Sequence, residues 1–204
     1  MSIAEAEKYI RDLHRKQKDP FLWPDYLTGL PDKAAVIKKM DEINPKLGEY
    51  SIVYIRIANI HPYLLYHGPG KHAEIVQWAA AIIKTTCDIC PHNFVGTFDT
   101  HDFVIVCRTG NVVKLFNRAQ ELFRKKAASY YSPTEVAKGL PPLAVGSNRK
   151  KVSYGLMKLI AVIAEKRLQV KKSDLIRNMA RMCDAIEGTE DEMVIMSNDN
   201  ILRE

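Results

Sequence analysis

Two carboxylates and an imidazole stand close together in the stretch Asp99-Thr100-His101-Asp102, between two apolar runs. Carboxylates in such a turn can hold a divalent cation when a neighbouring strand supplies a further acid. The apolar run from Ser51 to Ile57, which would supply that acid, carries Arg56, and a guanidinium repels cations. We therefore expect Asp99 and Asp102 to face water, and the sequence predicts neither a metal site nor a cofactor.

A second group of candidate ligands is the run Cys87-Asp88-Ile89-Cys90-Pro91-His92. Two thiols and an imidazole at this spacing make half of a zinc site. The sequence offers no second pair of that kind, although Cys107 and His101 could approach through a hairpin. The simpler interpretation is a pair of reduced cysteines packed at a helix end, and the role of Cys87 and Cys90 stays open.

The histidines lie mainly in one part of the chain, where they could form a pH-sensitive or metal-binding cluster or simply be solvated. Five of the six histidines belong to this group, namely His61, His67, His72, His92 and His101.

Length and composition restrict the function classes. The chain has 204 residues, 47% hydrophobic and 26% charged, which is typical of a globular protein. No apolar run is long enough to span a membrane and the N-terminus has no signal peptide, so we expect a cytoplasmic protein. Its net charge of +6 comes from scattered basic residues without interleaved aromatics, which makes a nucleic-acid partner an unfavoured hypothesis.

Hydrophobic periodicity predicts a series of helices and strands. Helices are expected at about 3–17, 34–40, 71–86, 112–123 and 175–186, strands at 51–57, 94–98, 103–107, 156–163 and 193–196, and a Pro- and Gly-rich excursion at 130–153 with a short hairpin around Gly146. Between the strands at 51–57 and 94–98 we expect a helix in two parts, and the segment 71–86 is one of them. This order predicts an α/β (α+β) domain in which helices flank one central sheet.

The N-terminal helix carries Ile3, Ala6, Ile10 and Leu13 at three- and four-residue spacing, which is typical of a narrow apolar seam. Pro20 to Pro24 then mark the start of the main domain. We predict a helix and linker over residues 1–20 and a single domain over 21–204.

Two motifs give the chain a family resemblance. Asp25 to Asp32, DYLTGLPD, closely resembles the D-x-LTGLPN motif that opens GGDEF domains, the bacterial diguanylate cyclases. Phe94 to Val106, FVGTFDTHDFVIV, stands where that family has its RYGGDEF hairpin, and Tyr130 to Met157 is similar to an insertion found in one branch. The resemblance covers roughly residues 25–197 and implies a ferredoxin-type central sheet related to nucleotidyl cyclases, flanked by helices.

The family joins two GTP molecules into cyclic di-GMP with metal ions held by acids on the first strand and in the hairpin. The resemblance places those acids at Arg56, Ala58 and His101, none of which is an oxygen ligand that Mg²⁺ prefers.

The hairpin keeps only part of the family motif. At the last two positions of the motif, Asp102 keeps an acidic side chain and Phe103 keeps the phenylalanine. Asp99 and Thr100 replace the paired glycines that let the phosphates approach the backbone.

The nucleotide contacts that the resemblance implies are also replaced. The two residues that would read guanine fall at Leu64 and about Ala73, neither of which can hydrogen-bond the base. The expected Ala-Asp pair is Ala180-Arg181, the phosphate-binding lysine falls near Gly188, and the R-x-x-D inhibition motif reads Cys90 to Asn93.

These losses favour a catalytically inactive GGDEF-like domain that serves as a regulatory or protein-interaction module in bacterial signalling. Its expected interaction surface is Arg56, Asp99, His101 and Asp102, or the N-terminal seam, with a homodimer or an unidentified signalling protein as partner. The alternatives are a sensor that binds GTP or cyclic di-GMP weakly, through Arg56 as a phosphate partner, and a residual cyclase.

Overall fold

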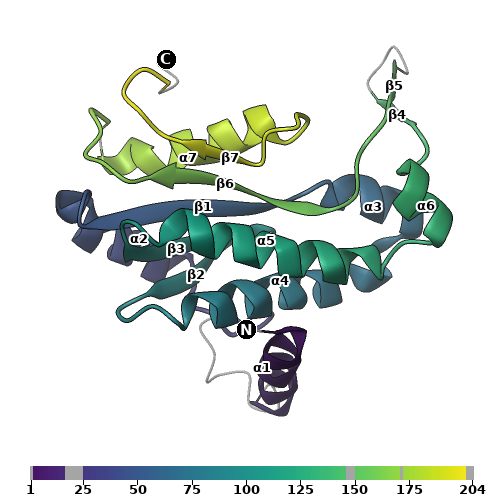
Figure 1. Cartoon of the computed structure of the whole chain (residues 1–204), viewed down its shortest axis with the longest axis horizontal. Helices are drawn as coiled ribbons and strands as arrows, with labels where there is room; N and C mark the ends of the chain where they lie inside the picture. The colour runs from purple at the N-terminus through teal and green to yellow at the C-terminus, as the bar shows by residue number, and fades with distance from the viewer. Residues whose placement is uncertain (1, 17–24, 146–149, 171, 201–204) are drawn as a thin grey trace.

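The chain alternates helices and strands around one sheet, as a computed structural model of residues 2–16, 25–145, 150–170 and 172–200 shows (Figure 1). The elements are α1 (Ile3–Lys16), α2 (Lys33–Ile43), β1 (Tyr50–Ala58), α3 (Ile60–His67), α4 (His72–Cys87), β2 (Phe94–Asp99), β3 (Asp102–Arg108), α5 (Val112–Ala128), α6 (Pro133–Lys138), β4 (Leu143–Val145), β5 (Lys150–Val152), β6 (Lys158–Ala164), α7 (Lys172–Ile186) and β7 (Met193–Ile195), with short 3₁₀ turns at Asn44–Lys46 and Pro69–Lys71.

The central sheet has five strands in the order β2-β3-β1-β6-β7. β1 lies in the middle and pairs antiparallel with β3 and β6, while β7 joins β6 in parallel. The predicted mixed sheet flanked by helices is therefore confirmed. The predicted hairpin around Gly146 is confirmed in its arms, because β4 pairs with β5, whereas its turn lies outside the described residues.

Each face of the sheet has its own apolar core, because successive side chains of a strand point to opposite faces. Val53, Ile55 and Ile57 of β1 pack with α4 and α5 on one face. Ile52, Tyr54 and Ala58 pack with α2 and α7 on the other, and Arg56 shares their side of the strand. The alternation thus directs Arg56 toward α7.

The motif at Asp25–Asp32 fixes the start of the domain to the sheet. The carboxylate of Asp25 accepts hydrogen bonds from the backbone N–H and the hydroxyl of Thr28, at 2.7 and 2.6 Å. The Thr28 hydroxyl lies 2.8 Å from that of Thr97 in β2, and Asp32 caps α2 by accepting from the N–H of Ala35. This motif therefore has a structural role in positioning α2 and β2.

The apolar seam of α1 faces α4, and Figure 1 shows α1 lying beside that helix. Ala6 and Leu13 are each only 1% exposed. His14 Nε2 lies 3.0 Å from Gln77 Oε1, and the Tyr9 hydroxyl donates to the carbonyl of Thr28. The seam proposed as a dimer or partner contact is thus covered within the chain.

The segment between α5 and β6 contains an unexpected helix, α6. It begins with a capping box, in which Ser132 and Glu135 bond to each other's backbone N–H. Glu135 also pairs with His67 of α3 at 3.0 Å, which joins the excursion to the main domain. In the described part of the chain, no helix is long and apolar enough to cross a membrane.

Candidate functional site

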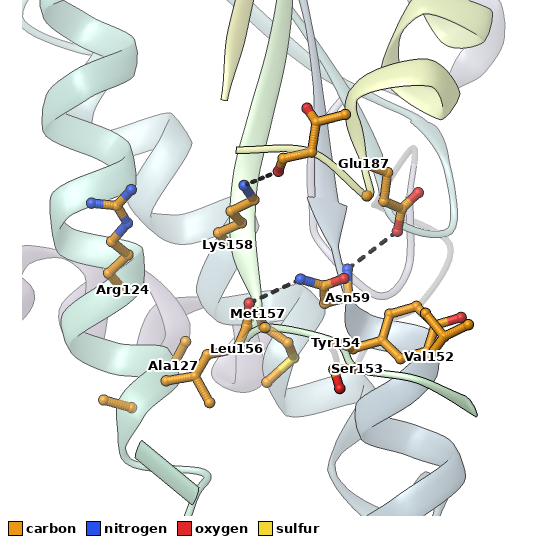
Figure 2. Close-up of a pocket in the computed structure, with 14 residues that line it drawn as sticks. Asn59, Arg124, Ala127, Val152, Ser153, Tyr154, Leu156, Met157, Lys158 and Glu187 are labelled. Atoms are coloured by element: carbon orange, nitrogen blue, oxygen red, sulfur yellow. Dashed lines mark hydrogen bonds between the residues drawn. The ribbon is translucent and has the colours of Figure 1, made fainter. Parts of the chain in front are cut away.

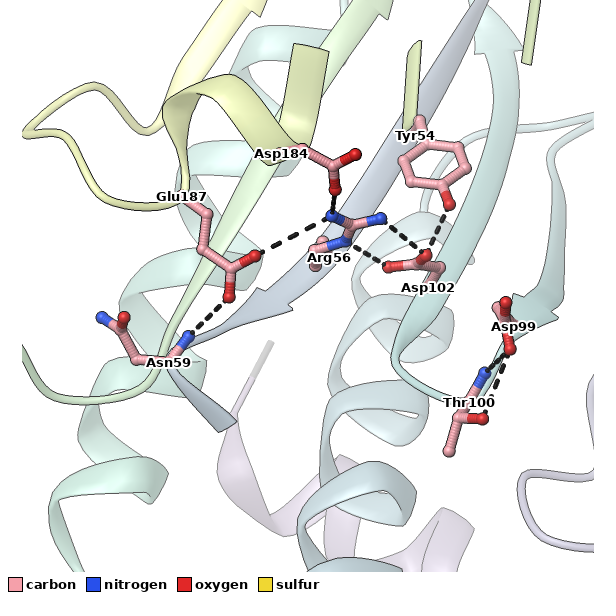
Figure 3. Close-up of polar contacts among 8 residues, drawn as sticks. All are labelled: Tyr54, Arg56, Asn59, Asp99, Thr100, Asp102, Asp184 and Glu187. Carbon is pink, nitrogen blue, oxygen red and sulfur yellow. Dashed lines mark hydrogen bonds and ion pairs between the residues drawn. The ribbon is translucent and has the colours of Figure 1, made fainter. Parts of the chain in front are cut away.

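The centre of the candidate site is Arg56, which lies on β1 directly opposite Asp102, the first residue of β3. The guanidinium and the carboxylate face each other, because paired residues of neighbouring antiparallel strands point to the same side of the sheet. Arg56 Nε donates to Asp102 Oδ1 at 2.8 Å, and Nη2 donates to Oδ2 at 3.1 Å (Figure 3). This two-point contact is the strongest geometry available to an Arg–carboxylate pair.

The Arg56–Asp102 pair is largely removed from water and has a third member. The side chain of Arg56 is 16% exposed and that of Asp102 is 9% exposed. The hydroxyl of Tyr54, two residues before Arg56 on the same face, donates to Asp102 Oδ2 at 2.5 Å. Asp102 therefore accepts three hydrogen bonds from β1, and its charge is balanced by a guanidinium. The prediction that Asp102 faces water is wrong, because Arg56 and Tyr54 hold it at the edge of the sheet, whereas Asp99 is exposed.

Two further carboxylates approach Arg56 from the C-terminal end of α7. Asp184 accepts a short hydrogen bond from Nη1, and Glu187 Oε2 lies 3.8 Å from the same nitrogen. Glu187 also accepts the backbone N–H of Asn59, at 3.2 Å. Asn59 adopts a left-handed backbone conformation with φ 61°, which asparagine tolerates better than most residues, and it ends β1 beside this cluster.

The electrostatics keep this cluster in one charge state. Burial lowers the pKa of Arg56, but the hydrogen bonds and charge of Asp102 outweigh it, so the pKa lies above its usual value. Burial first, and then the charge of Asp102, raise the pKa of Tyr54, which keeps its hydroxyl as a donor. Arg56 therefore stays charged and Tyr54 neutral through the physiological range.

A cavity of about 420 Å³ opens beside these residues. The cluster forms one wall, and the turn between β2 and β3 forms another. Its lining residues are Arg56, Ile57, Ile60, His61, Asp99, Thr100, His101, Asp102, Asp184 and Glu187. We call this cavity the Arg56 cleft. Four carboxylates and one guanidinium line it, so its charge is predominantly negative.

The structure gathers three of the five histidines named in the sequence at the rim of the Arg56 cleft. His72 Nε2 lies 2.8 Å from His101 Nε2, and the ring of His61 meets that of His101 edge-on at 4.9 Å. Burial, followed by the two neighbouring imidazoles, lowers the pKa of His101 to about 4. His67 contacts Glu135 instead, and His92 lies exposed in the segment before β2.

The lowered pKa of His101 has a consequence for stability. An unfolded histidine binds its proton near pH 6.5, whereas folded His101 does so only near pH 4. Between these values the unfolded state binds more protons, so the free energy of unfolding decreases as the pH falls. We expect the melting temperature to fall between pH 7 and 4.5, and His101→Gln to flatten that dependence.

Circular dichroism of thermal unfolding across this pH range measures the effect. His92→Asn is the matched control, because His92 is exposed and its φ of 59° suits asparagine. An equally steep fall in the His101→Gln variant would contradict this role of His101.

The other positions implied by the family resemblance lie away from the Arg56 cleft. Ala58 and Phe103 are fully buried in the cores on opposite faces of the sheet. Leu64 is partly buried in α3 and packs against the core, while Ala73 and Arg181 are exposed on α4 and α7.

The cysteines do not form the zinc arrangement considered from the sequence. Cys107 and His101 lie toward opposite ends of β3, so they cannot meet the same ion. Burial raises the pKa of Cys87 and raises that of Cys107 to about 12, which keeps both thiols protonated. In the described residues, no three His, Cys, Asp or Glu side chains are arranged to hold a metal ion.

A second cavity, of about 370 Å³, lies between α5, the segment Val152–Lys158 and the end of α7 (Figure 2). Its charged groups already have partners in the chain. Lys158 Nζ donates to the carbonyl of Thr189 at 3.1 Å, and Arg124 bonds to Glu192. The Arg56 cleft is therefore the candidate functional site.

Sequence reasoning identified Arg56, Asp99, His101 and Asp102, and the structure brings them to one cleft. It missed Tyr54, Asp184 and Glu187. The strand period of two places Tyr54 beside Arg56, and the three-residue spacing of Asp184 and Glu187 places both on one face of a helix, so the sequence held signals for all three.

Comparison with solved structures identifies the class of the fold, whereas comparison of sequences finds no match. No sequence-family profile matches the chain, and no curated protein matches it. Diguanylate cyclase SiaD from Pseudomonas aeruginosa, solved with its activator SiaC, is similar with a TM-score of 0.60 at 16% identity over 93% of this chain and 67% of that one.

Two isolated GGDEF domains are similar as well. The domain of DgcB from Caulobacter crescentus, solved with c-di-GMP, gives a TM-score of 0.55 at 13% identity, over 86% of this chain and 95% of that one. The FimX GGDEF domain from P. aeruginosa gives a TM-score of 0.55 at 14% sequence identity, over 84% of this chain and 98% of that one. The chain has a GGDEF-like, cyclase-type α+β fold.

Proposed function

We propose that this chain is a catalytically inactive GGDEF-like module that regulates or binds a signalling protein in the bacterial cytoplasm. The observation that carries the proposal is the ion pair of Arg56 with Asp102, at the position where the resemblance implies a metal-binding acid.

The residues present do not fit a Mg²⁺ ion. A hard cation needs free carboxylate oxygens, but both oxygens of Asp102 accept hydrogen bonds from Arg56, and Tyr54 adds a third. The guanidinium brings a fixed positive charge to the place that the cation would take, and His101 supplies nitrogen rather than oxygen. Arg56 therefore replaces the cation as the counter-charge of the cluster.

The guanine and phosphate contacts that the family resemblance implies are missing as well, and their loss would lower the cyclase rate further. Each lost transition-state contact of this kind costs about 3 kcal/mol, or roughly 100-fold in rate. Leu64 and Ala73 cannot hydrogen-bond guanine, and Asp99 and Thr100 put side chains where the family has glycine. Several such losses together support an inactive domain.

An assay with GTP tests this proposal. The purified chain is incubated with GTP and either Mg²⁺ or Mn²⁺, and the nucleotides are separated by chromatography. We expect no cyclic di-GMP above a protein-free blank, while SiaD with its activator SiaC serves as the positive control. Appreciable cyclic di-GMP, lost again on heating the chain, would end the proposal.

The alternative is a sensor that binds GTP or cyclic di-GMP, and the observation in its favour is the cavity beside Arg56. Three carboxylates from Asp102, Asp184 and Glu187 already surround the guanidinium, so a phosphate would have to displace like charges. Calorimetry with each nucleotide at millimolar concentration distinguishes the two, because a sensor gives heat and an interaction module gives none.

The exposed part of the site supports protein interaction. Asp99 and Thr100 lie exposed at the turn between β2 and β3, whereas Arg56 and Asp102 are mostly buried. A partner protein would therefore contact the turn, with Arg56 and Asp102 holding it in position.

A further inference from the structure

Three separate elements bring histidines to one point at the rim of the Arg56 cleft. His61 comes from α3, His72 is the first residue of α4, and His101 lies in the turn between β2 and β3. The Nε2 atoms of His72 and His101 are 2.8 Å apart, and the rings of His61 and His101 are 4.9 Å apart. The Arg56 cluster uses none of these three side chains, and only His101 belongs to the expected interaction surface.

The contact between His72 and His101 fixes where their Nε2 atoms meet. A contact of 2.8 Å between two Nε2 atoms needs one N–H donor and one acceptor, so at least one of the two rings offers a nitrogen lone pair at this contact. If the hydrogen of the donor ring moves to its own Nδ1, both Nε2 atoms present lone pairs to the same point. This tautomeric change releases no proton.

The surroundings favour a cation. The charges of Asp99 and Asp102 act on His101, and the single positive charge of the cleft, on Arg56, is already neutralised by carboxylates. His61 and His101 also line the cavity, which leaves room for water ligands. A cation placed between the imidazoles would thus have negative charge and solvent beside it.

We propose that His72 and His101 bind a divalent transition-metal ion of the Zn²⁺, Ni²⁺ or Cu²⁺ class, with His61 as a third ligand after its ring turns. Imidazole suits these ions, whereas Mg²⁺ prefers oxygen. Zn–N bonds of about 2.0–2.1 Å in a tetrahedral site place two nitrogens about 3.3 Å apart, so the Nε2 atoms must separate by only about 0.5 Å. The exposed side chain of His61 can reorient without disturbing a core.

Calorimetric titration of the untagged 204-residue chain with Zn²⁺ and, separately, Ni²⁺ tests this site. We expect one ion per chain in the wild type and a loss of affinity of more than about 10-fold in His72→Gln and in His101→Gln. The double variant should bind none. Magnesium at the same concentration should give no heat from this site.

His92→Asn is the control, because His92 lies beside Cys90 and outside the cluster. If the ion bound at the cysteines, this variant would weaken binding and the His72→Gln/His101→Gln variant would not. That result, or a wild type that binds neither ion below about 100 μM, would overturn the proposal. Circular dichroism confirms that each variant is folded, and Co²⁺ absorption spectra report nitrogen ligation independently. The outcome does not depend on whether the chain makes cyclic di-GMP.

Discussion

Replacing Arg56 with alanine is expected to lower the free energy of unfolding by about 3–5 kcal/mol. The substitution leaves the carboxylate of Asp102, 9% exposed, without the two donors that compensate its burial. Only the Tyr54 hydroxyl would still bond to it. This loss is a large part of the 5–15 kcal/mol that stabilises a typical domain. Chemical denaturation followed by circular dichroism measures it.

Arg108→Ala is the matched control for this prediction. Arg108 also lies on a strand that pairs with β1 and also meets a carboxylate, but its contact with Glu49 is 3.6 Å long and both side chains are about 60% exposed. Exposed pairs of this kind contribute at most about 1 kcal/mol. Equal losses in the two variants would show that burial of the Arg56 pair does not matter.

The fold could be predicted from the sequence where local pattern and tertiary packing agree. The apolar residues from Val112 to Phe123 repeat at helical spacing and lie in α5, and the run of β-branched and aromatic residues from Ser51 to Ile57 forms most of β1. By contrast, the helix at Pro133–Lys138 was missed although Ser132 and Glu135 have the spacing of a capping box. Its six residues are too few to show periodicity, and the neighbouring Pro and Gly suggested a loop.

The candidate site could be predicted only in part, because its members come from different elements. The hairpin motif pointed to Asp102, and the strand pattern pointed to Arg56, but neither indicated that the two would pair. That pairing depends on the register between β1 and β3. The carboxylates of Asp184 and Glu187 depend in turn on the position of α7 against the sheet. Register and helix position are long-range properties that a single sequence does not fix.

The guanidinium explains how a cleft lined by four carboxylates can persist without a cation. Here Arg56 contributes one positive charge that contacts Asp102, Asp184 and Glu187 simultaneously. This one side chain therefore supplies the charge that holds β1, β3 and α7 together. If so, exchanging that charge for an acid should make the fold depend on an added cation.

Arg56→Asp is the variant that tests this exchange, and we expect its stability to depend on magnesium. Without a divalent ion, the new carboxylate faces Asp102, Asp184 and Glu187, and the loss of stability should exceed that of Arg56→Ala. With Mg²⁺ at ten times its dissociation constant, binding restores about 1.4 kcal/mol. For a domain of this size that raises the melting temperature by about 3–6 °C.

Melting curves in EDTA and in Mg²⁺ at about 1–20 mM measure the effect, because weak carboxylate sites bind Ca²⁺ with dissociation constants of about 0.1–1 mM. The wild type should show no magnesium dependence, because its counter-charge is covalently attached. Arg56→Asn is the control that removes the guanidinium without adding a charge, and it too should not respond. A variant with aspartate at position 56 that melts at the same temperature in EDTA and in magnesium would show that the cluster cannot accept a cation. Arg56 would then be a structural counter-ion only, and its place opposite Asp102 would say nothing about a lost metal site.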